Sequence, residues 1–476
     1  MYPALATFLF TLGVIGLFLL DRDKTVQTSK ALWLPVFWVL IVGSRPVSVW
    51  LGIGPVNNLQ TADKYLDGSP FDKFLLSGML VVGLIVLARR GAQVGKILRR
   101  NSAILLFFMY CGVSVLWSEY SDVSFKRWEK AVSDLVMVLI VLTDMNPLAA
   151  TKRLLARVGF VLVPASILLI KYYPALGRSY NIWTWTPSYV GVTDHKNTLG
   201  MVCMVLAIGF LWRFLLAYQD IKDPHRIRRL LVHGTLIGMS VWLFMQAQSM
   251  TSQACFLLAA IFLIATSLGF VLRRRSLVQL LVLVLVTVPV STLLLGVGGG
   301  ALEEMGKDAT LTGRTDIWRL VLHMSGSPMV GTGFESFWLG DRANRMWNLY
   351  YFHPTQAHNG YIEVYLELGW IGILLLAAIL LAGYRNSVAT LRTNPDVGRI
   401  RMAFIAIGLV YNVTEAGFRM MTITWFFFLL SAVVIPEVAL EEATEQLPAD
   451  TSPSFEAWQR QRPPVPDYAR RRREAI

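Results

Sequence analysis

Long apolar stretches separated by short polar segments run along most of this 476-residue chain. A helix needs about 17–25 mainly apolar residues to cross a bilayer. The pattern predicts about twelve or thirteen such helices, typical of an all-α, polytopic integral membrane protein. The expected spans lie at residues 4–20, 31–51, 73–88, 102–118, 128–144, 154–172, 197–218, 229–247, 252–271, 276–296, 359–383, 400–416 and 418–436.

The composition supports a lipid environment. Apolar residues make up 55% of the chain and charged residues 16%, whereas a soluble domain carries about 25% charged residues. A net charge of +13 would suggest a nucleic-acid partner in a soluble protein. Most of this charge falls in short loops between apolar stretches, so we expect contact with anionic membrane lipids and no nucleic acid. The cysteines are all in apolar stretches, which predicts no disulfide and no metal site: Cys111, Cys203 and Cys255.

Positive charges are concentrated in alternate loops. Arg89–Arg100 and the triplet Arg273-Arg274-Arg275 stand out in the more basic set. The positive-inside rule assigns this set to the cytoplasm. The N-terminus then lies outside and the C-terminus inside, and the long segment 297–358 faces the periplasm or outer surface.

Three regions are expected along the chain. Residues 1–190 form an N-terminal transmembrane bundle, and residues 191–436 form a second membrane domain that includes the outer loop 297–358. Residues 437–476 are rich in Pro, Glu and Gln and end with the run Arg470–Arg473. This composition predicts a disordered, basic cytoplasmic tail.

The outer loop contains the first candidate site. Ile317, Leu320, Val321 and Met324 follow a helical period, and Thr312 is the expected N-cap. Arg314 would then lie in the first turn, close to free backbone N–H groups. An arginine beside a helix N-terminus is suited to binding an anion such as phosphate. The alternative is a surface arginine on an interfacial helix.

A second candidate site lies where the loop enters the next span. Asn359, Glu363 and Glu367 are spaced at i, i+4 and i+8, so they share one helix face. His358 stands at the mouth of that face, and a histidine close to a carboxylate is suited to act as a general base. The alternative is an interfacial histidine with structural carboxylates bonded to neighbouring helices.

The third candidate site is Gly191–Gly200, at the outer start of a span. Lys196 and Asn197 could cap a helix or meet an anionic head group. The alternative for Lys196 is a side chain that extends from the apolar region to the membrane interface.

These motifs, taken in chain order, resemble the O-antigen ligase and Wzy-type polysaccharide polymerase superfamily. The resemblance is strongest over residues 190–435. The matching pieces are His195-Lys196-Asn197 with Leu199-Gly200, then Leu311–Trp318, Ser327–Phe334, and His358–Glu363 with Glu367-Leu368-Gly369.

The resemblance implies a GT-C-like glycosyltransferase of the bacterial inner membrane. Such enzymes move a glycan from a polyprenyl-pyrophosphate carrier to an acceptor sugar on the periplasmic face. They need no nucleotide sugar, cofactor or metal. A polymerase of O-antigen or exopolysaccharide is favoured over a ligase, with a flippase and a chain-length regulator as possible partners.

The resemblance also implies site roles. His358 would be the base on the acceptor hydroxyl, with Glu363 as the next candidate, and Arg314 would bind the pyrophosphate. Substrate-binding residues would be Lys196, His195, Asn197, Asn359 and Trp318. One departure is that Met250 follows Gln248-Ser249, where many members carry a basic residue.

Two other classes of protein are compatible with many spans. A transporter or flippase of lipid-linked oligosaccharide would be expected to show internal repeats and charged residues at mid-span. An accessory subunit of a polysaccharide synthase would explain the spans but not the pairing of His358 with Arg314. The polar residues instead gather at the outer ends of spans, which favours chemistry at a surface.

Overall fold

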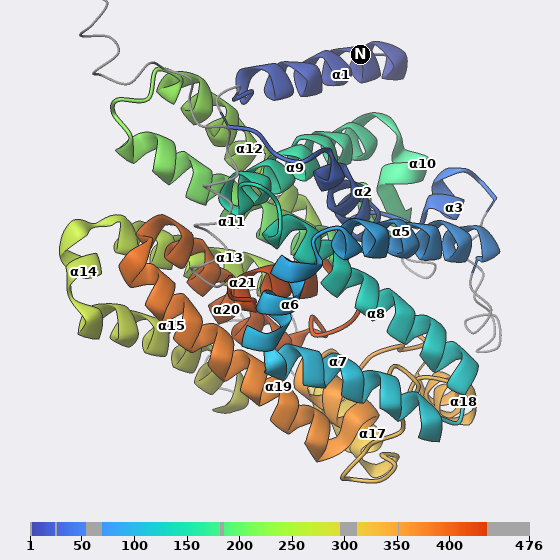
Figure 1. The fold of residues 1–476 in the computed structure, drawn as a ribbon. Helices are drawn as coiled ribbons and strands as arrows, with labels where there is room; N and C mark the ends of the chain where they lie inside the picture. The colour runs from blue at the N-terminus through green and yellow to red at the C-terminus, as the bar shows by residue number, and fades with distance from the viewer. Residues whose placement is uncertain are drawn as a thin grey trace, which may run out of the picture. The chain divides into compact units, whose positions relative to one another are not determined.

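The computed structural model describes residues 2–23, 26–53, 69–180, 185–295, 312–350 and 352–435. This part is almost entirely helical (Figure 1). Its one sheet has two short antiparallel strands, β1 (Arg178–Tyr180) and β2 (Pro187–Tyr189), with Ser179 opposite Ser188. The protein is therefore an all-α, polytopic membrane protein, as predicted.

Eight described helices are long and apolar enough to cross a membrane. They are α1 (Pro3–Leu20), α5 (Pro70–Ala88), α9 (Pro147–Tyr172), α11 (Lys196–Gln219), α12 (Arg226–Ala247), α13 (Met250–Ser267), α19 (Gly360–Thr393) and α20 (Pro395–Thr414). A ninth candidate is formed by α6 (Gly91–Arg100) and α7 (Ser102–Ser114), which meet at a bend of 92°.

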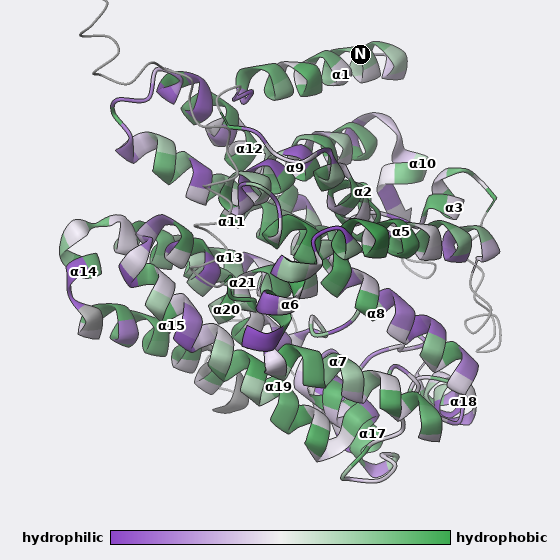
Figure 2. Ribbon diagram, in the orientation of Figure 1, coloured by the Kyte–Doolittle hydropathy of each residue, from purple (hydrophilic) through white to green (hydrophobic). Residues whose placement is uncertain are grey.

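The remaining predicted spans coincide with helices that are shorter or more polar. Apolar but short segments occur in α2 (Trp33–Val42), α15 (Arg275–Leu295) and α21 (Ile423–Ala432). The helix α8 (Ser121–Leu142) is long, but its first half carries several charges (Figure 2). The count of full-length spans among the described residues is thus lower than the number of apolar stretches.

Short helices complete the described part. They are the 3-10 turns η1 (Lys30–Leu32) and η2 (Val115–Trp117), and α3 (Val47–Trp50), α10 (Pro174–Gly177), α14 (Gly269–Arg273), α17 (Thr312–His323) and α18 (Gly340–Leu349). The first residue of α17 is Thr312, so Arg314 lies in its first turn, as expected.

The core of the described part is formed by closely packed helices. The helix α11 packs on α12 and α13, α19 packs on α20, and α5 packs on α8. Every residue of α21 is buried, including three consecutive phenylalanines, Phe426–Phe428. A helix that is apolar on all sides is stable only when it is surrounded. The helices around α21 therefore hold the loop between α20 and α21 in a fixed place.

The described residues up to Ile435 form one compact unit. The predicted boundary near residue 190 stays a prediction. The predicted tail, 437–476, lies outside the described residues.

Candidate active site

A cavity of about 1210 Å³ is lined by the ends of several helices. Its walls come from the starts of α5, α8, α11 and α17, the segment 352–358, and the loop after α20. These segments all belong to the loop set predicted to face outward or to the span ends next to it. The cavity therefore lies at one end of the bundle, which is the periplasmic end if the predicted orientation holds.

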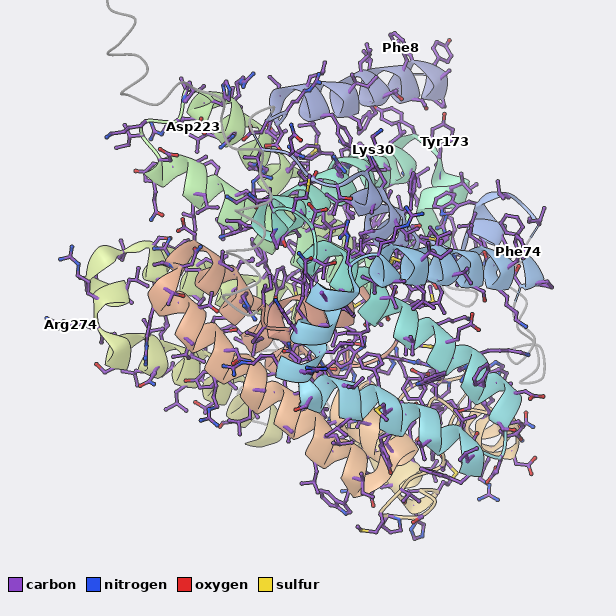
Figure 3. The ribbon with its side chains drawn as sticks, in the orientation of Figure 1. Phe8, Lys30, Phe74, Tyr173, Asp223 and Arg274 are labelled. Atoms are coloured by element: carbon purple, nitrogen blue, oxygen red, sulfur yellow. The ribbon has the colours of Figure 1, made fainter. Side chains whose placement is uncertain are left out.

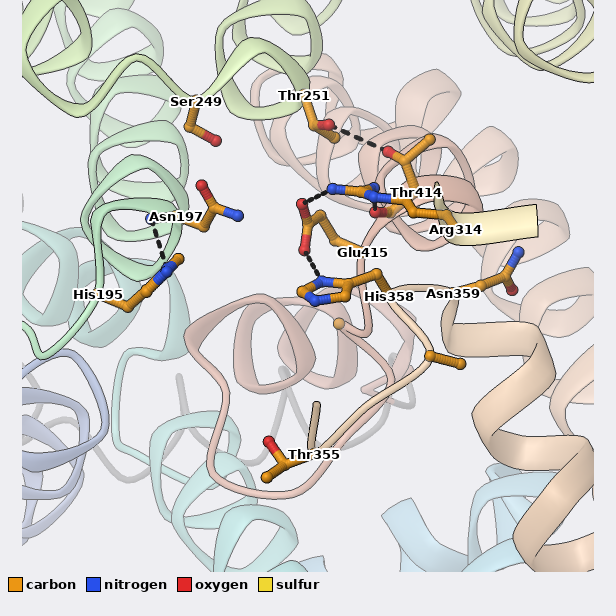
Figure 4. Close-up of polar contacts among 12 residues, drawn as sticks. His195, Asn197, Ser249, Thr251, Arg314, Thr355, His358, Asn359, Thr414 and Glu415 are labelled. Atoms are coloured by element: carbon orange, nitrogen blue, oxygen red, sulfur yellow. Dashed lines mark hydrogen bonds and ion pairs between the residues drawn. The ribbon is translucent and has the colours of Figure 1, made fainter. Parts of the chain in front are cut away.

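Three side chains meet at one wall of this cavity. The His358 Nδ1 lies 3.1 Å from Glu415 Oε2, and an Arg314 terminal nitrogen lies 3.1 Å from Glu415 Oε1 (Figure 4). Arg314 also donates a hydrogen bond to the backbone oxygen of Thr414. The Glu415 side chain is only 8% exposed, whereas His358 and Arg314 are 25% and 30% exposed. A buried carboxylate thus holds two basic groups at the cavity surface.

The sequence around His358 explains how its ring reaches Glu415. His358 has a left-handed backbone with φ 52°, which is uncommon for a residue with a side chain. Asn359 caps α19: its Oδ1 accepts hydrogen bonds from the backbone N–H groups of Tyr361 and Ile362. Its Nδ2 donates to the Val413 oxygen at 3.0 Å, so Asn359 points away from the ring (Figure 4). Asn359 therefore serves here as a cap that also ties α19 to α20.

Gly360 allows the two segments to approach closely. A Cβ atom at Gly360 would lie 2.0 Å from Asn412 Oδ1. The Gly360 N–H donates to the backbone oxygen of Glu415 at 3.1 Å. In the motif His358-Asn359-Gly360, the histidine thus contacts Glu415, the asparagine caps α19, and the glycine allows the close approach to Asn412.

The charge state of Glu415 follows from its neighbours. Glu415 lies just after α20, outside the spanning helix. Burial raises the pKa of its carboxyl, but the His358 hydrogen bond and the Arg314 charge lower it by more, so the pKa lies below its ordinary value. The ionised carboxylate can only accept hydrogen bonds. His358 must therefore donate through Nδ1, which leaves Nε2 as the nitrogen that can accept a proton.

The cavity-side position of Arg314 depends on the helix α17. Trp318, one turn later, donates from Nε1 to the Ala357 oxygen at 2.7 Å. Ala357 immediately precedes His358, so Trp318 joins the arginine-bearing helix to the histidine-bearing segment. Trp318 is not among the cavity-lining residues.

The third motif lies across the cavity. His195 is the N-cap of α11, and its Nδ1 accepts from the Asn197 N–H at 3.2 Å. His195 and Asn197 line the cavity, and Lys196 does not. Burial lowers the pKa of His195, with Asp194 acting in the opposite direction. Figure 4 shows both lining residues on the far side from Glu415.

Glu363 and Glu367 are buried away from the cavity wall. The Glu363 carboxylate accepts hydrogen bonds from Trp338 Nε1 at 2.9 Å and from the Ala357 N–H. Glu363 is therefore placed to shape the segment before His358, and the carboxylate beside the ring is Glu415. Met250, the departure noted above, is likewise absent from the cavity lining.

The motif Ser327–Phe334 fastens the outer segment to α19. The helix α19 is interrupted at Gly369, where φ is 63°. Thr332 and Gly333 donate backbone hydrogen bonds to Leu366 and Glu367, and Trp370 and Ile371 donate back to Pro328 and Met329.

Close backbone contact at this junction requires two glycines. A Cβ atom at Gly331 would lie 2.3 Å from the Glu367 carbonyl carbon, and one at Gly369 would lie 2.3 Å from that of Met329. Both glycines have positive φ, which favours glycine. Two glycines 38 positions apart thus both allow the outer segment to pack closely on the break in α19.

Sequence reasoning missed several residues of the cavity. Glu415 is one, although its signal, a carboxylate at the end of an apolar stretch, is the one that drew attention to Glu363. Arg419 is another, and it forms an ion pair with Glu335 at 2.9 Å. Lys126 and Lys130, on α8, also line the cavity. In the sequence, these lysines were visible only as charges at the start of the weakly apolar stretch at 128–144.

Known proteins resemble part of this chain, and one match includes the segments that carry Arg314 and His358. Residues 239–377 match the family model described as O-antigen ligase. The chain is also 25% identical over 295 residues to the exopolysaccharide production protein ExoQ of Rhizobium meliloti (strain 1021). That alignment covers 59% of this chain and 64% of the relative's length. Both matches support the resemblance found in the sequence.

Proposed function

We propose that this chain is a membrane glycosyltransferase of polysaccharide biosynthesis. The proposal is supported by its similarity to the O-antigen ligase family model and to an exopolysaccharide production protein. Its donor is a glycan on a polyprenyl-pyrophosphate carrier, and its acceptor is a sugar hydroxyl. We place the reaction at the periplasmic face of the bacterial inner membrane, with a flippase and a chain-length regulator as candidate partners. We favour polymerisation over ligation because the curated relative is named for exopolysaccharide production.

The observation that carries the proposal is the grouping of His358, Glu415 and Arg314 at the wall of one large cavity. Glu415 orients the His358 ring by accepting a hydrogen bond from its Nδ1. Nε2 is then available to take the proton of the acceptor hydroxyl. The exposed part of the Arg314 guanidinium lies close enough to bind an anion beside the same ring.

The bonds and protons of the proposed reaction are all accounted for by these groups. The acceptor oxygen attacks the anomeric carbon of the donor glycan, and the bond between that carbon and the phosphate oxygen breaks. The hydroxyl proton passes to His358 Nε2. The carrier leaves as a pyrophosphate anion, whose charge Arg314 stabilises. Because pyrophosphate is a good leaving group, positioning and charge stabilisation supply most of the catalysis.

A reconstituted assay tests this proposal. Purified protein in liposomes receives lipid-linked glycan, without nucleotide sugar and with EDTA. We expect glycan transfer with release of polyprenyl pyrophosphate. Movement of intact lipid-linked glycan across the bilayer without any transfer would instead identify a flippase. Loss of transfer on adding EDTA would show that a metal takes part.

A further inference from the structure

The part of the cavity lined by α5 and α8 carries positive charges of a different kind. Lys126 and Lys130 lie four residues apart on α8, so their side chains share one helix face. Both are half-buried and line the cavity, as does Lys73 in the first turn of α5. The helices α5 and α8 pack together. We call Lys73, Lys126 and Lys130 the lysine wall.

These lysines differ from the arginines near His358 in their partners. Arg314 is paired with Glu415, and Arg419 with Glu335. Lys126 and Lys130 form no hydrogen bond or ion pair within the part of the chain that the structure describes, although the charges of Glu335, Asp72 and Glu129 attract Lys130.

The carboxylates near the lysine wall have other partners. Asp72 accepts a hydrogen bond from the Ser48 N–H at 2.9 Å, and Glu129 accepts one from the Ser77 hydroxyl. Half-buried ammonium groups without a paired carboxylate are costly to desolvate, and an anionic ligand would offset this cost.

The surroundings of the lysine wall indicate the kind of anion. The helix α5 exposes large apolar side chains outside the cavity, and Phe71 and Phe74 are 40% and 82% exposed. Phe74 projects away from the bundle in Figure 3. An anionic head group at the lysine wall would therefore have an apolar helix surface beside it for a lipid tail.

We propose that the lysine wall binds the pyrophosphate head group of a second, acceptor lipid-linked glycan. This inference rests on the proposed function, since Arg314 already accounts for the donor pyrophosphate. The cavity then holds two lipid-linked substrates, with the donor head group at Arg314 and the acceptor head group at the lysine wall. Such an arrangement suits a polymerase, in which both substrates carry the same head group.

Binding stoichiometry tests the second site directly. The probe is a polyprenyl pyrophosphate without sugar, titrated into the full-length protein in nanodiscs. We expect two equivalents bound to the unaltered protein. Lys126→Ala/Lys130→Ala should lose one equivalent, and Arg314→Ala should lose the other. Lys126→Arg/Lys130→Arg should retain both, since it keeps the charges.

Control and contrary outcomes separate this proposal from the proposed function. Lys222→Ala/Arg228→Ala removes two charges from the loop and helix start at the other end of α11 and should bind two equivalents. A single equivalent, lost only in Arg314→Ala, would overturn the second site and leave the donor site standing. No binding at all would count against the proposed function as well. Displacement of one equivalent by a free acidic oligosaccharide would assign the lysine wall to a glycan carboxylate and overturn the lipid assignment.

A second test compares the KM values for the donor and for the acceptor. A donor with its acceptor hydroxyl blocked is combined with an acceptor whose pyrophosphate linkage cannot be cleaved. Lys126→Ala/Lys130→Ala should raise the KM for the acceptor about tenfold or more, because hydrogen bonds to a charged group are lost. The KM for the donor should not change. An equal rise in both values would show a structural effect and overturn the proposal.

Discussion

The His358 Nδ1 and the Glu415 Oε2 lie 3.1 Å apart although 57 positions separate them in the chain. The second carboxylate oxygen of Glu415 is bound by Arg314, which lies 101 positions away. One buried side chain thus determines the position of both groups that the proposed reaction uses.

Replacing His358 should slow glycan transfer without preventing donor binding. Loss of a general base typically costs about 10²–10⁴-fold in rate, so we expect this decrease for His358→Ala. Transfer of lipid-linked glycan and binding of polyprenyl pyrophosphate are measured in parallel. The matched control is His323→Ala, an exposed histidine at the end of α17. His353 is less suitable, because it lines the cavity. Normal transfer by His358→Ala would remove the histidine from the reaction.

Replacing Arg314 should abolish transfer and weaken donor binding. Arg314→Ala leaves Glu415 with His358 as its remaining basic partner, and it removes the group proposed to hold the pyrophosphate. Arg314→Lys should restore activity only in part, because an ammonium is a point charge and lacks the planar fork of guanidinium. Arg319→Ala, an exposed arginine on the same helix, is the control. Full activity in Arg314→Ala would assign the pyrophosphate to another basic residue.

Glu415 should stabilise the protein in a pH-dependent manner. Its pKa in the folded protein lies below the ordinary value, which is about 4.3 for glutamate in an unfolded chain. Its contribution is therefore present above about pH 4.3 and is lost as pH falls through the lower, folded pKa. The Tm of Glu415→Gln in detergent should lie below that of the unaltered protein at pH 7. The difference should shrink below about pH 4. A constant difference across this range would contradict an ionised Glu415 in the folded protein.

The predicted orientation can be tested by cysteine labelling of whole cells. The native cysteines are each about 1% exposed, so they should not react. An impermeant reagent should label Arg319→Cys, in α17, and should not label Ala92→Cys, in α6. The reverse pattern would place the cavity at the cytoplasmic face.

The close backbone contacts at Gly331 and Gly369 should be sensitive to a single methyl group. Gly369→Ala places a Cβ atom against the Met329 carbonyl at a positive φ, so we expect a loss of about 1–3 kcal/mol in the free energy of unfolding. Thermal unfolding in detergent measures the effect. Gly238→Ala, in α12, meets no atom within 4 Å and should leave Tm almost unchanged. Equal Tm values for both variants would contradict the tight packing described above.

Local patterns in the sequence were enough to predict the helices and much of the site. Each predicted span overlaps a helix, because a hydrophobic stretch of sufficient length has few alternatives in lipid. Arg314 in the first turn of α17 also followed from helical spacing. His358 was correctly expected at the mouth of a helix, but its carboxylate partner was sought at Glu363.

The remaining site residues depend on contacts between distant segments. Glu415 reaches His358 because Gly360 packs on Asn412, which brings α19 and α20 together. The lysine wall reaches the same cavity because α8 packs on α5. The spacing of residues along one helix does not show which distant segments pack against it. When the partner segment is unknown, a single charged residue in the sequence is interpreted as a solvated side chain.

The four backbone hydrogen bonds that join residues 328–333 to the break in α19 limit how substrates gain access. Moving this part of the outer segment away from α19 would break all four hydrogen bonds, which contribute about 1 kcal/mol each. It would also break the close backbone contacts at Gly331 and Gly369. The helix α5, with its apolar outer surface, borders the cavity on another side. A substrate that enters beside α5 would break none of these hydrogen bonds, and its carrier chain would stay against an apolar surface during a turnover.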